Sequence, residues 1–182
     1  MENFQDTKQQ PSKLKSALNY GAVLGLVLMI ISLFSYVLEL YSSSWISWLS
    51  TIILVLGIVW GIKRYRDEEL GGYISYGQGV GYGTLVGLFA GIIIAFVSYI
   101  YLGFFDDGFI QYTLSEQEKA LYNNSGVSAE EAEKVLSSMR VFTSPSVIAV
   151  SSLFGQVFFA LIISLIAMIF LKKDIDSFED SI

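Results

Sequence analysis

The sequence contains no cysteine and no histidine, and only two of its 182 residues are proline. The lack of cysteine excludes disulfides, thiolate chemistry and lipoprotein-type anchoring, and the lack of histidine removes the commonest metal ligand and general base. Charged side chains are also scarce, at 15% of the residues, whereas a soluble domain has about 25%. The chain is instead 53% hydrophobic with a mean hydropathy of +0.57, which indicates that lipid surrounds most of it.

Four uncharged apolar runs are long enough to cross a bilayer as helices, which requires about 20 residues each. We expect spans at 16–38, 45–62, 77–104 and 147–171, with the second short and the third long. The first run exceeds the apolar core of a cleaved signal peptide, about 7 to 15 residues, so we expect it to be retained. The predicted fold class is all-α, an integral membrane four-helix bundle that forms a single membrane domain over residues 1–182.

Lysine and arginine are distributed unevenly between the two sides of the predicted membrane domain. The loop between the third and fourth spans has three: Lys119, Lys134 and Arg140. The two tails and the 63–76 loop, which share the opposite side, have eight: Lys8, Lys13, Lys15, Lys63, Arg64, Arg66, Lys172 and Lys173. Because basic residues favour the cytoplasmic side, we expect both termini in the cytoplasm. The net charge is −6, whereas nucleic-acid-binding proteins normally have a basic patch or stripe, so we expect no nucleic-acid partner.

A glycine-rich stretch, GQGVGYGTLVGLFAG, covers residues 77–91. A nucleotide-binding loop would need the G-x-G-x-x-G spacing or a nearby lysine, and the stretch has neither, since no Lys or Arg lies between Arg66 and Lys119. Glycine recurs there every four residues instead, which is typical of close helix packing in membranes. The first two spans have the same spacing, and the predicted helix-packing residues are Gly21, Gly25, Gly57, Gly61, Gly79, Gly83, Gly87 and Gly91.

These glycines lie toward the cytoplasmic half of the predicted bundle, where we expect the first three helices to touch. The outer halves carry bulkier side chains, among them Phe34, Phe96 and Phe104. We therefore expect the helices to splay at that end. Two outcomes are possible in the space between the splayed helices. Either the aromatic rings fill it, which we favour, or a cavity opens toward the outer side of the membrane.

Residues 105–146 form the one sizeable polar segment, which is too small to hold a core of its own. Ser115 with Glu118, and Ser128 with Glu131, have the spacing of helix capping boxes. We therefore expect two short helices in this extracytoplasmic loop between the third and fourth spans. Seven acidic residues stand against three basic ones in it, and we interpret this as a solvated acidic surface, with a cation site as the alternative.

No ionisable side chain lies in the middle of a predicted span, although transporters usually retain such groups along their pathway. Glu39 is interfacial, and Gln156 is the deepest strongly polar side chain. Gln156 suits an interhelical hydrogen bond, with a substrate contact as the alternative. Serines within the spans have no His or Lys at that depth to activate them, so we expect no enzymatic activity, no metal site and no cofactor.

The segment GGYISYGQGVGYGTLVGLFAGIIIAFVSYIYLGFF, residues 71–105, resembles the start of the third span in domain-of-unknown-function family 4199, small integral membrane proteins found mostly in Bacteroidota. The shared pattern of a glycine, Ile-Ser-(Phe or Tyr)-Gly, a small-residue helix and an aromatic exit is matched by Gly72, Ile74, Ser75, Tyr76 and Gly77. The family often has Asp-Pro after this span, where this chain has Asp106-Asp107. The layout is similar across nearly the whole chain, so the resemblance implies a four-span fold in a bacterial inner membrane and adds no chemistry.

These observations favour a structural, assembly or accessory component of the membrane. Its partners would be the lipid bilayer and other membrane proteins, or a second copy of itself. The alternative is a small-molecule or ion permease subunit that works as an oligomer, with Gln156 and Glu39 near its path. A third hypothesis is a membrane-anchored sensor whose acidic outer loop binds a cation or a peptide. A continuous polar stripe would favour the permease, and an exposed small-residue or apolar face would favour the accessory component.

Overall fold

The computed structural model describes residues 12–40, 43–105, 108–124 and 129–173. The described chain is helical and has no strand, which confirms the predicted all-α class. Its elements are α1 (Lys13–Val37), α2 (Ser44–Arg64), the π-helix η2 (Tyr65–Glu69), α3 (Tyr76–Phe104), α4 (Gly108–Asn124), α5 (Ala129–Phe142) and α6 (Pro145–Leu171).

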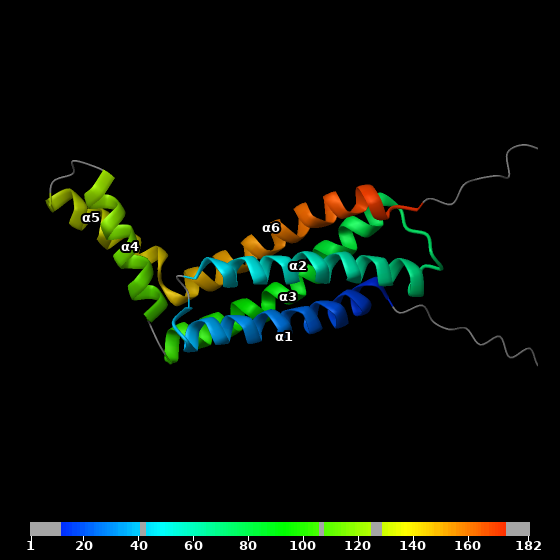
Figure 1. The fold of residues 1–182 in the computed structure, drawn as a ribbon, viewed down its shortest axis with the longest axis horizontal. Helices are drawn as coiled ribbons and strands as arrows, with labels where there is room; N and C mark the ends of the chain where they lie inside the picture. Colours follow the sequence, from blue (N-terminus) through cyan, green and yellow to red (C-terminus); the bar gives the residue numbers. More distant parts are fainter. Residues whose placement is uncertain (1–11, 41–42, 106–107, 125–128, 174–182) are drawn as a thin grey trace, which may run out of the picture.

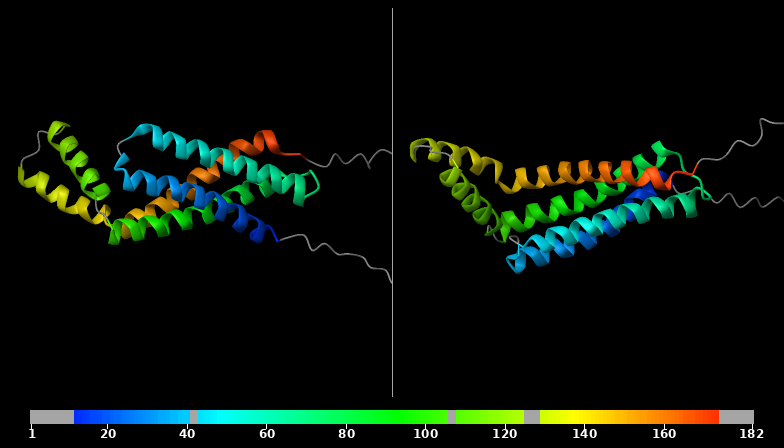
Figure 2. Two further views of the ribbon diagram at one scale, coloured as in Figure 1. Left: turned by 60° about the horizontal axis from the view of Figure 1, so that its bottom comes forward. Right: turned by 45° about the horizontal axis from the view of Figure 1, so that its top comes forward.

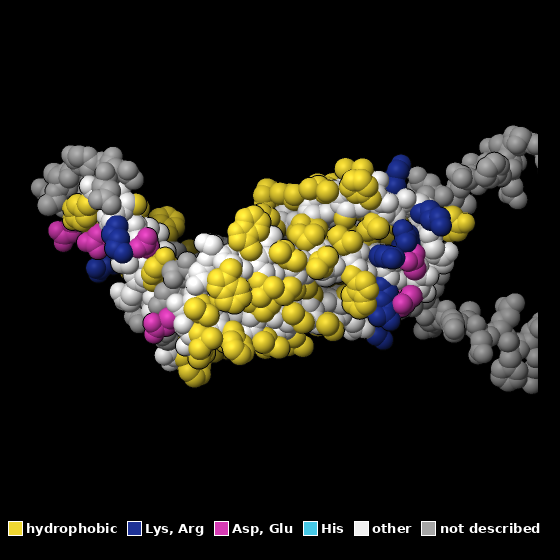
Figure 3. All heavy atoms as spheres, in the orientation of Figure 1, with side chains coloured by type: hydrophobic (Ala, Val, Ile, Leu, Met, Phe, Trp, Pro, Cys, Tyr) yellow, Lys and Arg dark blue, Asp and Glu magenta, His cyan; other side chains and the backbone are white. Residues whose placement is uncertain are grey.

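Four of the helices are long and apolar enough to cross a membrane, and they lie side by side as a bundle (Figures 1 and 2). α1 begins and α6 ends at the same end of the bundle, which we call the terminal end. The short helices α4 and α5 extend beyond the opposite end, which we call the hairpin end. Figure 3 shows Lys and Arg side chains gathered at the terminal end and others on the α4–α5 segment, with apolar side chains covering the face between the two ends.

The second membrane helix is longer than the sequence predicts, because η2 continues α2 into the charged residues that follow. Together they cover Ser44–Glu69, which is 26 residues. An ion pair across one helical turn, Arg64 Nε to Glu68 Oε2 at 2.6 Å, accompanies this extension. The wider π turn then closes with a bond from the Leu70 amide to the Tyr65 carbonyl.

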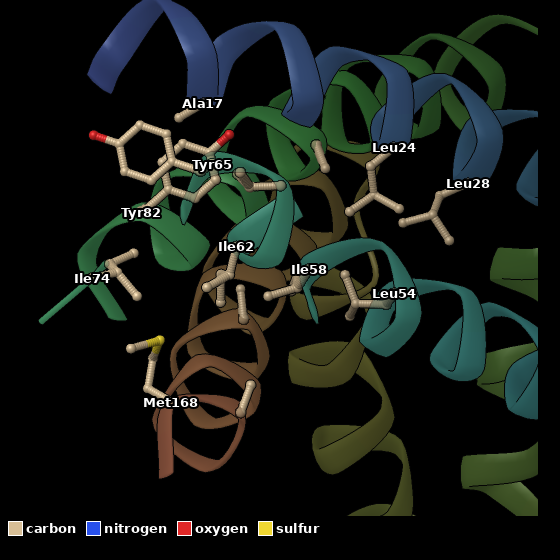
Figure 4. Packing of buried hydrophobic residues seen from close by; sticks show 14 residues of the cluster. Ala17, Leu24, Leu28, Leu54, Ile58, Ile62, Tyr65, Ile74, Tyr82 and Met168 are labelled. Atoms are coloured by element: carbon tan, nitrogen blue, oxygen red, sulfur yellow. The ribbon is translucent and has the colours of Figure 1, made fainter. Parts of the chain in front are cut away.

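The core of the bundle lies in its terminal half (Figure 4). Ile58, Ile62, Tyr82 and Met168 are completely buried there, and the Tyr65 ring stacks on the Tyr82 ring with centroids 4.0 Å apart. Three further contacts hold this end together. They are a two-bond bridge between the Ile74 and Lys173 backbones, a bond from Arg66 Nη1 to the Leu171 carbonyl, and one from the Tyr76 hydroxyl to the Leu165 carbonyl.

Helix ends near the bundle have local chemical causes. Ser75 begins α3 with a reciprocal capping box to Gln78, and Pro145 occupies the first turn of α6. The expected N-cap at Ser115 is wrong, because half-buried apolar residues starting at Gly108 are already helical and Ser115 donates to the Tyr112 carbonyl inside α4. Ser128, the other expected N-cap, lies outside the described residues, immediately before α5.

Candidate functional site

The glycine ladder of α3 faces α6, which presents residues at the same four-residue spacing in the opposite direction. A Cβ atom added to a ladder glycine would in most cases overlap the α6 side chain opposite it. At Gly87, for example, it would overlap the Cβ of Ala160. The facing pairs are Gly79 with Met168, Gly83 with Ser164, Gly87 with Ala160 and Gly91 with Gln156.

The glycines of α1 and α2 have different surroundings. Cβ atoms at Gly21 and Gly25 would meet the backbone of α3 near Ala90, whereas one at Gly57 would meet the Leu24 side chain of α1. Gly61 faces only the edge of the Tyr82 ring, at 3.9 Å. We expected the first three helices to touch in this half of the bundle, and Gly21 and Gly25 do bring α1 against α3. The ladder itself packs mainly on α6, which the sequence did not indicate, and it meets α2 where Gly83 faces Ile62. α2 approaches the other helices through side chains.

A chamber of about 300 Å³ lies among the four membrane helices toward the hairpin end. We favoured aromatic filling over a cavity at this end, and the structure has both. The Tyr36 ring of α1 stacks on the Tyr101 ring of α3, whereas Phe34, Phe96 and Phe104 are exposed on the outside of the bundle. Ile58 and Ile62, completely buried, close the bundle between this chamber and the terminal end. The chamber is lined by Leu28, Ser32, Ser50, Thr51, Leu54, Val55, Ile94, Gln156, Phe159 and Ile163.

The polar groups of the chamber come from three helices. Thr51 is satisfied within its own helix, since its hydroxyl donates to the Ser47 carbonyl at 2.9 Å. The Gln156 amide nitrogen is buried and has no hydrogen-bond partner among the described residues. The interhelical bond that would satisfy this donor is therefore missing. An unsatisfied buried donor costs about 1–3 kcal/mol, which makes Gln156 the candidate contact for a ligand in the chamber.

A second polar group lies at the terminal end, and sequence reasoning did not identify it. The Ser16 hydroxyl donates to Glu69 Oε1 at 2.5 Å and lies 3.0 Å from the Tyr82 hydroxyl. Because serine has a single hydroxyl proton, Tyr82 is the donor in the second contact. Glu69 Oε2 is buried without a partner among the described residues. The π turn places the Glu69 carboxylate against Ser16 of α1. The sequence has no pattern that predicts such a turn.

Glu39, named for the transport hypothesis beside Gln156, and the described acidic residues of the outer loop do not form a site. Glu39 is exposed just after α1, with a left-handed φ of 52°, and it does not line the chamber. Glu116 pairs with Lys119 at 2.8 Å. The described ranges contain no group of three or more acidic side chains that could hold a metal ion, and Asp106 and Asp107 lie outside those ranges.

The comparisons with known proteins give one match. The family described as "Protein of unknown function (DUF4199)" matches residues 19–173, a stretch that includes most of α1 and all of α2, α3 and α6. No curated protein and no solved structure matches the chain.

Proposed function

The chain belongs to the DUF4199 family of proteins of unknown function, and on that premise we propose that it is a multi-pass protein of a bacterial inner membrane with both termini in the cytoplasm. Four apolar helices of 25 to 29 residues support the multi-pass part. The Lys and Arg side chains at the terminal end support the orientation, because such residues are retained on the cytoplasmic side. The bacterial source is part of the proposal and follows from the resemblance stated in the sequence analysis, which implies a bacterial inner membrane.

Within that membrane the protein acts as an accessory component that docks a transmembrane helix of another protein, without catalysis. One observation carries this proposal: an apolar groove of about 320 Å³ runs between α1 and α2 on the outside of the bundle. Gly57 and Leu24 pack against each other within this groove, so a docked helix would contact the exposed side chains on either side of them, such as Val23 and Leu56. The α1–α2 groove is lined by Tyr20, Val23, Leu24, Val27, Ile53, Leu56, Gly57 and Trp60.

The groove has a defined boundary toward the terminal end. The Tyr20 and Trp60 rings meet edge to face with centroids 6.0 Å apart. The Arg64 guanidinium lies over both rings, 5.8 Å and 5.4 Å from their centroids. A docked helix would therefore have aromatic contacts at this boundary and aliphatic contacts along the rest of the groove.

Site-specific photo-crosslinking in native membranes tests this function. A benzophenone amino acid at Leu56, which is 61% exposed in the groove, should give one discrete product with another membrane protein. The matched position is Phe154, which is 71% exposed on α6, and it should give none. Val23→Trp, which fills the groove, should abolish the Leu56 product.

Two results would contradict the accessory role. Identical products from Leu56 and Phe154 would mean that the groove has no preference over the rest of the surface. A product at twice the mass of the chain would identify the partner as a second copy and replace the heteromeric role with self-association.

The permease subunit is the second candidate, and the chamber is the observation that favours it. A water-accessible vestibule toward the hairpin end would be half of an alternating-access pathway. The buried Ile58 and Ile62 side chains would have to separate for a solute to reach the terminal end. Because no charged residue of the described ranges lines the chamber, its solute would be uncharged.

A further inference from the structure

We propose that the chamber, together with an adjoining groove, binds a neutral amphiphile with a single apolar chain and an uncharged carbonyl or hydroxyl head. The inference rests on the arrangement of two adjoining hollows and does not depend on the accessory role. The second hollow, of about 310 Å³, lies between α2 and α6 and is lined by Val55, Val59, Ile163, Ile166, Ala167 and Phe170. Val55 and Ile163 also line the chamber, so the two hollows adjoin at these side chains.

The polar groups are confined to one of the two hollows. Ser32, Ser50, Thr51 and Gln156 all line the chamber, whereas every residue that lines the α2–α6 groove is apolar. A molecule that occupies both hollows therefore needs a polar end toward the hairpin end and an apolar chain toward the terminal end. This polarity distinguishes the proposed ligand from a plain alkyl chain, which would leave the Gln156 amide unsatisfied.

The head group must be uncharged, because among the described residues no Lys, Arg, Asp or Glu lines either hollow. Gln156 is the twelfth residue of α6, about 16 Å along the helix from its first residue at 1.5 Å per residue. A charged head at that depth, without a counter-charge, would be strongly disfavoured. The amide has both donor and acceptor atoms, so by rotation it can donate to a carbonyl or accept from a hydroxyl.

The groove also sets the length of the chain. Phe170 lies fourteen residues beyond Gln156 on α6, a helical rise of about 21 Å. Ile166 is 56% exposed along this path, so the groove is open to the surrounding bilayer on one side. A long-chain molecule can therefore enter sideways from the membrane, with its head reaching the chamber last.

Photoaffinity labelling of the purified full-length chain in lipid nanodiscs tests the proposal. The probe is hexadecanol with a diazirine in its chain, and the competitors are unlabelled hexadecanol, decylbenzoquinone and palmitate. Labelling should be saturable and should map to peptides that contain Val59 or Phe170. Hexadecanol and the quinone should both compete, whereas palmitate, charged at neutral pH, should compete at least tenfold less well. The better of the two neutral competitors identifies the head as a hydroxyl or a carbonyl.

Three variants separate the head contact from the chain contact. Gln156→Leu should weaken saturable labelling about tenfold, the effect of losing one buried hydrogen bond that leaves its partner unsatisfied. Ile166→Trp should block the groove and abolish saturable labelling. Ile169→Trp is the matched control, since Ile169 is 62% exposed on the same helix but does not line the groove, and it should bind like the parent. Each variant is first checked for an unchanged melting temperature in detergent.

Several outcomes would overturn the proposal. Labelling that does not saturate and is equal in all variants would mean that the probe reports ordinary lipid contact with the bundle. Normal labelling of Gln156→Leu would remove the head contact and leave a site for an alkyl chain only. Equal competition by palmitate would contradict the neutral head. No labelling at all would mean that the two hollows bind no such amphiphile.

Discussion

Gly87 of α3 and Ala160 of α6 are packed so closely that a Cβ on the glycine would overlap the Cβ of the alanine. The first prediction follows from this pair: Gly87→Leu should lower the free energy of unfolding by about 1–3 kcal/mol, because the larger side chain pushes α6 away. Thermal unfolding in detergent, followed by circular dichroism, measures the loss.

Gly155→Leu is the matched control for that change. A Cβ at Gly155 would meet nothing within 4 Å, although the residue also lies inside a membrane helix. It should therefore unfold at the parent temperature. If both leucine variants unfold alike, the predicted packing role of the ladder is wrong, and if Gly87→Leu loses only a dimer, the ladder is a self-association face.

The second prediction concerns the polar group at the terminal end. Ser16→Ala should destabilise the fold by about 1–3 kcal/mol, because it removes the hydroxyl that donates to the Glu69 carboxylate. Tyr82→Phe should cost about 1 kcal/mol, since it deletes a donor and keeps the ring that stacks on Tyr65. Chemical unfolding in mixed micelles can rank the two variants. A Ser16→Ala protein as stable as the parent would mean that the contact with Glu69 contributes nothing.

The third prediction is the orientation in the membrane, which can be measured on a background free of cysteine. Cysteines at Ser43 and at the exposed Glu118 should react with a membrane-impermeant thiol reagent in intact cells. A cysteine at Asp67 should react only after the cells are opened, because the basic residues keep that end in the cytoplasm. Labelling of position 67 in intact cells, with protection of position 118, would invert the topology.

The fourth prediction separates the accessory component from the permease. Purified protein in liposomes should give no ion or proton flux above that of empty vesicles. In the part of the chain that the structure describes, no charged side chain lines the chamber, and Ile58 and Ile62 close the bundle between the chamber and the terminal end. Gln156→Leu should remain folded, with a change of at most about 1–2 kcal/mol. A robust flux that disappears in Gln156→Leu would contradict the accessory role and favour the permease function.

The sequence was sufficient to predict the four membrane helices. Their length reflects the thickness of the bilayer, and their lack of charge reflects its apolar interior. It also identified the packed face of α3 from the spacing of Gly79 to Gly91. It did not identify α6 as the partner of that face, because the residues opposite, Ala160 and Ser164, are of types common on any membrane helix. Contact partners depend on helix crossing and rotation, which a spacing pattern does not contain.

The two polar features of the interior were harder to predict, for different physical reasons. The chamber is lined by residues of all four membrane helices, so it depends on how each helix is rotated about its axis. Glu69 belongs to a charged segment that is typical of a solvated loop. The closing bond from Leu70 to Tyr65 turns it toward Ser16, and a π turn has no characteristic residue pattern.

The pairing of α3 with α6 has a consequence for biogenesis. A ribosome makes the helices in sequence order, so α1, α2 and α3 are complete before the α4–α5 segment and α6 emerge. During that interval the ladder of α3 has no partner, and the cleft that becomes the chamber is bounded on one side only by lipid or by the insertion machinery. Assembly of the interior is therefore a late event that waits for the fourth helix, and a chain truncated before Pro145 would present a strip of bare backbone to the membrane.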